Sequence, residues 1–190
     1  MHLPYIADQT YSNTNFNQTG LSKAEYDNCT FINCDFSETY LSTISFLECE
    51  FIICNLSSAK IKDASLNTIT FKDCKLLGIA FFECNPFLLA LQFENCNLNH
   101  SQFNGMKLSN TTFSNCTIQD VDFTDTDLSK AQFTNSDLTS SNFENTILTN
   151  ADLSNAQNYT INPSLNKLTD AKFSRNQIEG LLKDFKIQIV

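Results

Sequence analysis

The residue at every fifth position of this chain is large and apolar over two long runs. The first run extends from Phe16 to Phe81 and the second from Phe93 to Leu153, and neither contains a polar residue at these positions. A period of five fits neither an α-helix, which repeats every 3.6 residues, nor a flat β-strand, which repeats every two. It requires a coil that turns one large side chain inward in each five-residue unit. The sequence therefore predicts a solenoid, in which each unit packs only against its neighbours.

The other positions of the unit are equally regular. The residue two places before the large one is small or medium-sized, and the remaining three are mostly Asn, Asp, Ser, Thr, Lys and Gln. In this pattern the sequence resembles the pentapeptide-repeat family, whose consensus is Ala-(Asp/Asn)-Leu-x-x; close matches begin at Val121, Ala131 and Ala151. The resemblance covers about residues 11–173. It implies an all-β solenoid, a right-handed quadrilateral β-helix with four units per turn, so residues twenty apart should stack on one face.

All eight cysteines fall in the small inward register or its direct continuation. Cys34, Cys54 and Cys74 are twenty residues apart and should form a ladder inside one face. The strand spacing of about 4.8 Å permits a disulfide on distance alone, but in-register side chains point the same way. A tetrahedral zinc site would need converging thiolates. We therefore expect small buried thiols, no metal and no cofactor, and a reducing compartment.

The charge and the composition restrict the partners and the cellular location that the protein can have. The net charge is −9, and residues 91–160 alone carry eight acids and two bases. An acidic rod repels nucleic acid and membranes, so we expect no direct nucleic-acid binding and no membrane association. Residues 1–11 lack the basic start and apolar core of a signal peptide, and no apolar stretch reaches the roughly 20 residues of a membrane span. The sequence thus predicts a cytoplasmic protein.

The repeat breaks first at 82–92. Phe81 and Phe93 are twelve residues apart instead of ten, so two residues are extra. The residues of a possible contact loop are Pro86, Phe87 and Leu88. The alternative is a bulged turn whose apolar residues fold into the core, and the apolar character of the segment favours this alternative.

The repeat breaks again after Ala156, where a distorted coil is expected at 157–166. Ser174 and Gln177 then form a capping box, the sequence signature of a helix N-terminus. One apolar helix face follows at spacings of three and four residues. Its residues are Ile178, Leu181, Leu182 and Phe185. Ile187, Ile189 and Val190 predict a short strand, so the expected layout is an N-terminal segment at 1–10, the β-helix at 11–173 and a helix with a strand at 174–190.

The C-terminal tail narrows the resemblance. The segments 162–168, 171–174 and 180–185 are similar to the C-terminal module of the quinolone-resistance (Qnr) and microcin-immunity branch of the family. In that branch the helix caps the solenoid and pairs two copies end to end into a homodimeric rod. The rod mimics DNA and binds DNA gyrase or topoisomerase IV. The resemblance therefore implies a non-enzymatic protein that protects a type II topoisomerase from quinolones or a toxin.

Mimicry of DNA requires that acidic residues gather on one face. B-DNA carries one charge per about 1.7 Å, so a rod of about 38 Å would need roughly 20 charges, more than twice the net charge of this chain. The candidate acidic face consists of Asp120, Asp122, Asp125, Asp127, Asp137 and Glu144. The alternative is that these residues only solvate the outer surface.

The sequence contains few candidate catalytic residues, and it leaves open a second function, that of a protein-interaction scaffold. The histidines are His2 and His100, neither of which forms a Ser–His–acid or Cys–His motif, so we expect no enzyme. The alternative function is a protein-interaction scaffold with an unrelated cytoplasmic partner. Its support is the outward apolar group Ile32, Ile52 and Ile53, unless the N-terminal segment Leu3–Ile6 lies across it.

Overall fold

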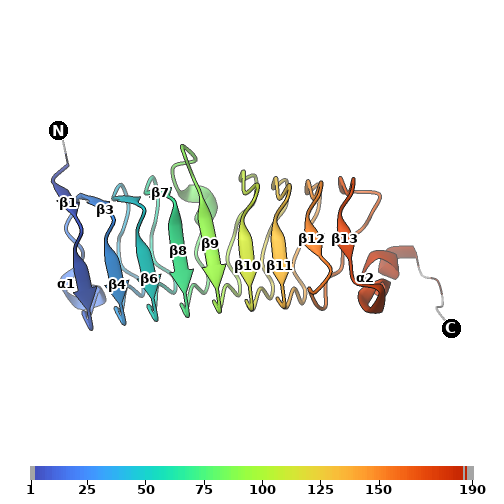
Figure 1. The fold of residues 1–190 in the computed structure, drawn as a ribbon, viewed down its shortest axis with the longest axis horizontal. Coiled ribbons are helices and arrows are strands. Elements are labelled where there is room, and N and C mark those ends of the chain that lie inside the picture. Colours follow the sequence, from blue (N-terminus) through green and yellow to red (C-terminus); the bar gives the residue numbers. More distant parts are fainter. Residues whose placement is uncertain (1–2, 186, 188–190) are drawn as a thin grey trace.

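The computed structural model describes residues 3–185 and 187 and shows a straight rod of stacked coils (Figure 1). Partner residues in neighbouring coils are twenty apart, as in the parallel pair Phe31 and Phe51. Four five-residue units therefore complete one coil, and each coil advances the rod by about 4.8 Å. The predicted fold, an all-β quadrilateral solenoid with a short C-terminal helix, is confirmed.

Two faces of the rod carry parallel sheets, of which sheet A covers the first coils and sheet B runs along the rod. Sheet A consists of β1 (Tyr5–Ala7), β3 (Glu25–Asp27), β5 (Ser45–Leu47) and β7 (Ser65–Asn67). Sheet B consists of β2 (Thr10–Ser12), β4 (Thr30–Ile32), β6 (Glu50–Ile52), β8 (Ile69–Lys72), β9 (Leu91–Glu94), β10 (Thr112–Ser114), β11 (Gln132–Thr134), β12 (Asp152–Leu153) and β13 (Lys172–Phe173). Isolated parallel bridges join the coils on the other two faces and on the sheet A face beyond β7.

Short helical segments interrupt two of the coils, and others follow the last coil (Figure 1). They are α1 (Phe16–Thr19), η1 (Phe81–Glu83), η2 (Arg175–Gln177), α2 (Glu179–Leu182) and η3 (Lys183–Phe185). None of the helices within the described ranges is long and apolar enough to cross a membrane.

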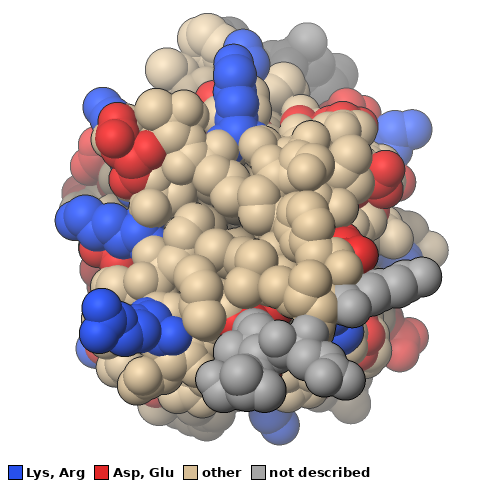
Figure 2. Space-filling view, turned by 90° about the vertical axis from the view of Figure 1, so that its right-hand side faces the viewer, with Lys and Arg blue, Asp and Glu red and all other residues tan. Residues whose placement is uncertain are grey.

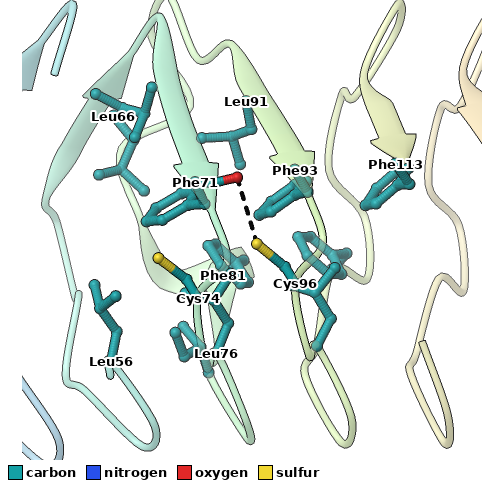
Figure 3. Packing of buried hydrophobic residues seen from close by; sticks show 14 of the residues in the cluster. Leu56, Leu66, Phe71, Cys74, Leu76, Phe81, Leu91, Phe93, Cys96 and Phe113 are labelled. Carbon is teal, nitrogen blue, oxygen red and sulfur yellow. Dashed lines mark hydrogen bonds between the residues drawn. The ribbon is translucent and has the colours of Figure 1, made fainter. Parts of the chain in front are cut away.

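The core is a set of aromatic and aliphatic ladders that run along the rod (Figure 3). Phe93 stacks on Phe113 and Phe113 on Phe133, with ring centroids 5.1 and 4.8 Å apart. Rings of neighbouring ladders meet edge to face, as Phe103 and Phe113 do at 6.3 Å. Each such pair contributes about 0.5–1.5 kcal/mol beyond the apolar area it buries. The five-residue register thus becomes a continuous stack instead of a separate core in each coil.

Most turns between units, which form the corners of each coil, pass through the left-handed region of backbone conformation. Asn33, for example, has φ 50° and Asn115 has φ 52°. Asn and Asp tolerate this conformation better than other non-glycine residues because their short polar side chains bond locally. Ile53 occupies the same corner one coil after Asn33 with φ 57°. A β-branched residue is strained there.

The repeat begins earlier than the expected boundary at residue 11. Strand β1 pairs with β3 in register, Ile6 opposite Tyr26, so this part of the N-terminal segment belongs to the first coil. Ile6 continues the inward register at the spacing of five, which explains its place in the ladder. Strand β1 lies in sheet A, whereas Ile32 and Ile52 pair in sheet B. The N-terminal strand therefore does not cover the isoleucine pair.

Candidate partner-binding surfaces

Three of the six candidate acidic residues come together on one face. Asp122 forms a parallel bridge with Asn142, and the backbone N–H of Asp125 donates to the carbonyl oxygen of Glu144 at 2.9 Å. Asp122, Asp125 and Glu144 therefore lie on adjacent coils of the same face. We call these three residues the acidic patch.

The other three candidates lie on neighbouring faces or corners. Asp137 bridges Gln157 on the preceding face, and Asp127 bridges Ile147 on the following face. Asp120 occupies the corner before the patch, with its Oδ2 3.8 Å from Nδ1 of His100. The expectation of a single acidic face is therefore wrong, because a spacing of five places successive units on different faces.

Hydrogen bonds within the turns explain why aspartate occurs at several of these positions. The Oδ1 atom of Asp122 accepts hydrogen bonds from the backbone N and Oγ1 of Thr124 at 3.0 and 2.6 Å. Asp127 accepts likewise from the backbone N of Ser129 at 2.9 Å. Asparagine makes the same contact at Asn97 and Asn142. The backbone therefore requires a short side chain with an acceptor oxygen there, but it does not require a negative charge.

Corner geometry explains two further aspartates in the same way. Asp120 has φ 54° and Asp125 has φ 57°, and Asn115 and Asn135 occupy equivalent corners. Glu144 is at neither kind of position and is exposed. The negative charges of the patch are thus additional to what the fold needs.

The carboxylate of Asp137 is engaged within the rod. Partial burial raises its pKa, but hydrogen bonds from Thr139, Asn158 and Gln119 lower it more, so the pKa is below its ordinary value. The donors lie 2.6 Å (Thr139 Oγ1), 2.8 Å (Asn158 Nδ2) and 2.6 Å (Gln119 Nε2) from the carboxylate oxygens. Asp137 links three successive coils, so its role is first of all structural.

A second group of acids lies at the other end of the rod, and sequence reasoning missed it. Asp8, Glu25, Asp27 and Glu48 all belong to the first coils of the sheet A face or its corner. The hydroxyl of Tyr5 donates to Asp27, and this hydrogen bond raises the pKa of Tyr5. Tabulating charges at the spacing of twenty, face by face, would have found this group.

The break at 82–92 forms a small projecting loop. Ser65 pairs with Asn85 twenty residues later, but Ile69 pairs with Leu91 twenty-two residues later. The two extra residues therefore fall within 86–90, and this loop rises above the other turns before β9 (Figure 1).

The apolar residues of the loop do not all enter the core. Phe87 is 72% exposed and Leu88 61%, and Pro86 is exposed, whereas Leu89 is partly buried and packs against the core. The favoured expectation of a turn folded into the core is wrong for these three loop residues. Pro86 stands where a large inward residue is expected, and it has no N–H to donate to the next coil.

The cysteines are free and buried, in agreement with the expectation. The thiol of Cys96 donates to the carbonyl oxygen of Phe71 at 3.4 Å (Figure 3). The thiol of Cys116 donates likewise to the carbonyl oxygen of Phe93 at 3.7 Å. Ser136 continues the ladder with the same bond to Phe113 at 3.2 Å. Burial also raises the pKa of Cys49 to about 12. The ladder thiols of Cys96 and Cys116 thus serve as small interior hydrogen-bond donors to backbone carbonyls.

The C-terminal segment covers the end of the rod. Ser174 caps η2, because its Oγ accepts from the backbone N of Asn176 at 3.2 Å. Gln177 does not complete the predicted capping box; its Oε1 accepts from the backbone N of Asn158 at 3.3 Å. The Gln177 side chain thus provides the hydrogen-bond acceptor for a backbone N–H of the last coil. The expected single helix is divided into η2, α2 and η3.

The apolar residues of this cap fall into two groups. Leu181 packs against the core, and Leu182 is half-buried, whereas Ile178 is 40% and Phe185 51% exposed. Figure 2 shows uncharged residues at the centre of this end and charged residues at its rim. Of the predicted terminal strand, Ile187 has no regular structure, and Ile189 and Val190 lie outside the described residues.

Comparisons with known proteins agree with this architecture. A family profile described as "Pentapeptide repeat region" matches residues 24–86, 44–123 and 87–153. No curated protein matches the chain. Among solved structures, full-length QnrB1, a plasmid-mediated fluoroquinolone resistance protein, is 19% identical, with 96% of this chain and 100% of that chain covered at a TM-score of 0.47.

A cyanobacterial protein is similar to the same degree. HetL from Nostoc sp. strain PCC 7120, a pentapeptide repeat protein involved in heterocyst differentiation regulation, is 17% identical, with 88% of this chain and 86% of that chain covered at a TM-score of 0.49. At such identities and TM-scores, neither protein's role transfers to this chain. The matched segments of the family profile together span residues 24–153, which is more than half of the chain, and the protein therefore belongs to the pentapeptide-repeat family.

Proposed function

We propose that this protein is a non-enzymatic binding protein that places its acidic patch on the positively charged DNA-binding surface of a type II topoisomerase, DNA gyrase or topoisomerase IV. The observation that carries the proposal is the patch itself. Asp122, Asp125 and Glu144 lie on two adjacent coils whose outward positions on this face hold no lysine or arginine. Their charges exceed what the turns require, because asparagine fills the same turn positions elsewhere.

The charge density favours local mimicry over mimicry along the whole rod. The net charge of −9 over a length of about 38 Å is about one charge per 4 Å, against one per about 1.7 Å in B-DNA. Three carboxylates on coils about 4.8 Å apart come closer to the density of DNA. We therefore expect the patch to contact one basic surface of the enzyme, where it would compete with a short stretch of duplex.

The proposal includes a homodimer joined through the C-terminal cap. Ile178 and Phe185 are exposed at an end whose centre is uncharged (Figure 2). With Leu181 and Leu182 they form an apolar surface that a second copy would cover around a twofold axis. Such pairing doubles the length of the rod and presents the acidic patch twice.

Two further elements of the proposal are the absence of catalysis and a cytoplasmic location. His100 is exposed beside Asp120, and His2 lies outside the described residues. Eight free cysteines fit a reducing compartment.

The test is a supercoiling assay with purified gyrase, with and without ciprofloxacin. We expect micromolar protein to inhibit supercoiling or to reduce drug-induced DNA cleavage, and Asp122→Lys/Asp125→Lys to abolish the effect. A matched control is Asp35→Lys/Asp73→Lys, which changes the net charge equally and alters one turn aspartate and one corner aspartate elsewhere. No effect of the wild-type protein, or equal loss in both variants, would contradict the proposal.

A second candidate is a scaffold for an unrelated partner. The exposed Phe87 and Leu88 in the loop, with Ile53 at 56% exposure, favour it. This candidate predicts that Phe87→Ser/Leu88→Ser abolishes partner binding, while Asp122→Lys/Asp125→Lys does not.

A further inference from the structure

The segment Cys84–Ala90 can be aligned with its neighbouring coils in two ways. Leu88 lies twenty residues after Thr68, which is a corner residue, and twenty residues before Leu108, which is a core residue. The observed alignment follows the preceding coil: Asn85 pairs with Ser65, and its backbone N donates to the carbonyl oxygen of Ala64 at 2.8 Å.

The observed alignment is unfavourable for Leu88 and Pro86. Leu88 takes a corner with φ 54° and is 61% exposed. The left-handed conformation costs a non-glycine residue roughly 1–2 kcal/mol. Pro86, twenty residues after the core residue Leu66, is exposed where a buried side chain is expected, and it has no N–H for the ladder. In return, Cys84 is buried at 6% exposure and Asn85 keeps its bridge.

The other alignment reverses these gains and losses. Counting back from Leu108 puts Leu88 at the inward position, between Leu66 and Leu108, and puts Ala90 at the corner. The two extra residues then become Cys84 and Asn85, which leave the ladder. Pro86 moves to the small inward position, two places before Leu88.

We propose that this segment is a two-state register switch, in which a shift of two residues buries Leu88 and expels Cys84. The observed state buries Cys84 and keeps the bridge of Asn85, whereas the shifted state buries Leu88. The free-energy difference between the two states is therefore small enough for a bound partner to reverse. A partner that holds Leu88 at the surface would stabilise the observed state. The proposal does not depend on the identity of that partner.

The thiol of Cys84 reports the switch. Wild-type protein is treated with iodoacetamide, and alkylation rates are measured by peptide mass spectrometry at Cys84 and, as internal references, at Cys74 and Cys116. The reference thiols stay within the ladder in both states. We expect Cys84 to react roughly tenfold faster than Cys74, because the minor state exposes it.

Three variants make the test specific. Leu88→Asn relieves the strain of the left-handed corner in the observed state and should slow the alkylation of Cys84 roughly tenfold. Ala90→Asn places a residue that tolerates the left-handed conformation at the corner of the shifted state, so it should accelerate the alkylation of Cys84 several-fold. Thr68→Asn changes the equivalent corner one coil earlier, where φ is 57°. It should leave the ratio of the Cys84 and Cys74 alkylation rates unchanged. Equal rates at Cys84 and Cys74 in the wild-type protein, or a change in the same direction in the Leu88 and Ala90 variants, would overturn the proposal.

Discussion

Gly180 packs so closely against Tyr159 that no side chain fits between them. A Cβ at position 180 would overlap the backbone oxygen of Tyr159 and come within 2.9 Å of its Cδ2. The carbonyl oxygen of Gly180 also accepts from the backbone N of Ile161 at 2.9 Å. This contact fixes the C-terminal cap on the last coil.

Gly180→Ala should therefore detach the cap without unfolding the rod. We expect faster hydrogen exchange at the amide of Ile161 and faster proteolysis within 174–185. The control is Gly105→Ala, where no atom lies within 4 Å but φ is 71°, so only a local strain of about 1 kcal/mol is expected. Equal protection of Ile161 in both variants would show that the cap does not depend on this contact.

Ile53 offers a stabilising substitution. Ile53→Asn should raise the free energy of unfolding by about 1 kcal/mol, because asparagine relieves the left-handed corner. The reciprocal change, Asn33→Ile, at φ 50° in the same column, should lower it by a similar amount. Urea denaturation of the three proteins tests both; a destabilised Ile53→Asn would mean that the exposed isoleucine makes a compensating contact.

Asp137 should make stability depend on pH. Its pKa in the folded protein is lowered from the ordinary 3.8, so its contribution is complete above that value and is lost as the pH falls through the lower folded pKa. The stability difference between wild type and Asp137→Asn should therefore shrink below about pH 4. Urea midpoints at pH 6 and pH 3 measure it. A difference that is constant across this range would contradict the assignment.

The apolar end should mediate dimerisation. Leu181→Asp/Leu182→Asp places two charges on the cap and should give a monomer by light scattering. Because Leu181 also packs against the core, a second variant, Phe185→Asp, changes an exposed position only. It should also be monomeric while keeping wild-type circular dichroism. A monomeric wild-type protein would exclude the end-to-end rod.

Much of the fold could be predicted from the sequence because the repeat determines burial locally. Phe93, Phe113 and Phe133 stack as the register required, and the cysteines line the interior. The loop could not be predicted in the same way. Whether Leu88 faces the core depends on competition with Cys84, and two alignments of nearly equal quality cannot be separated by pattern alone.

The candidate surface was only partly predictable for a different reason. Each unit rotates to a new face, so residues close in sequence, such as Asp125 and Asp127, diverge, while Asp122 approaches Asn142. The cap contact between Gly180 and Tyr159 left no signal in the repeat, because it joins the solenoid to a segment outside the five-residue pattern.

The central claim is that the acidic patch competes with DNA for a topoisomerase. The direct measurement is fluorescence anisotropy of labelled protein titrated with DNA-free gyrase, followed by addition of unlabelled duplex. We predict saturable binding that duplex DNA reverses, and that Asp122→Lys/Asp125→Lys weakens at least about tenfold while Asp35→Lys/Asp73→Lys does not. Absence of binding, or binding that excess duplex leaves intact, would contradict the account.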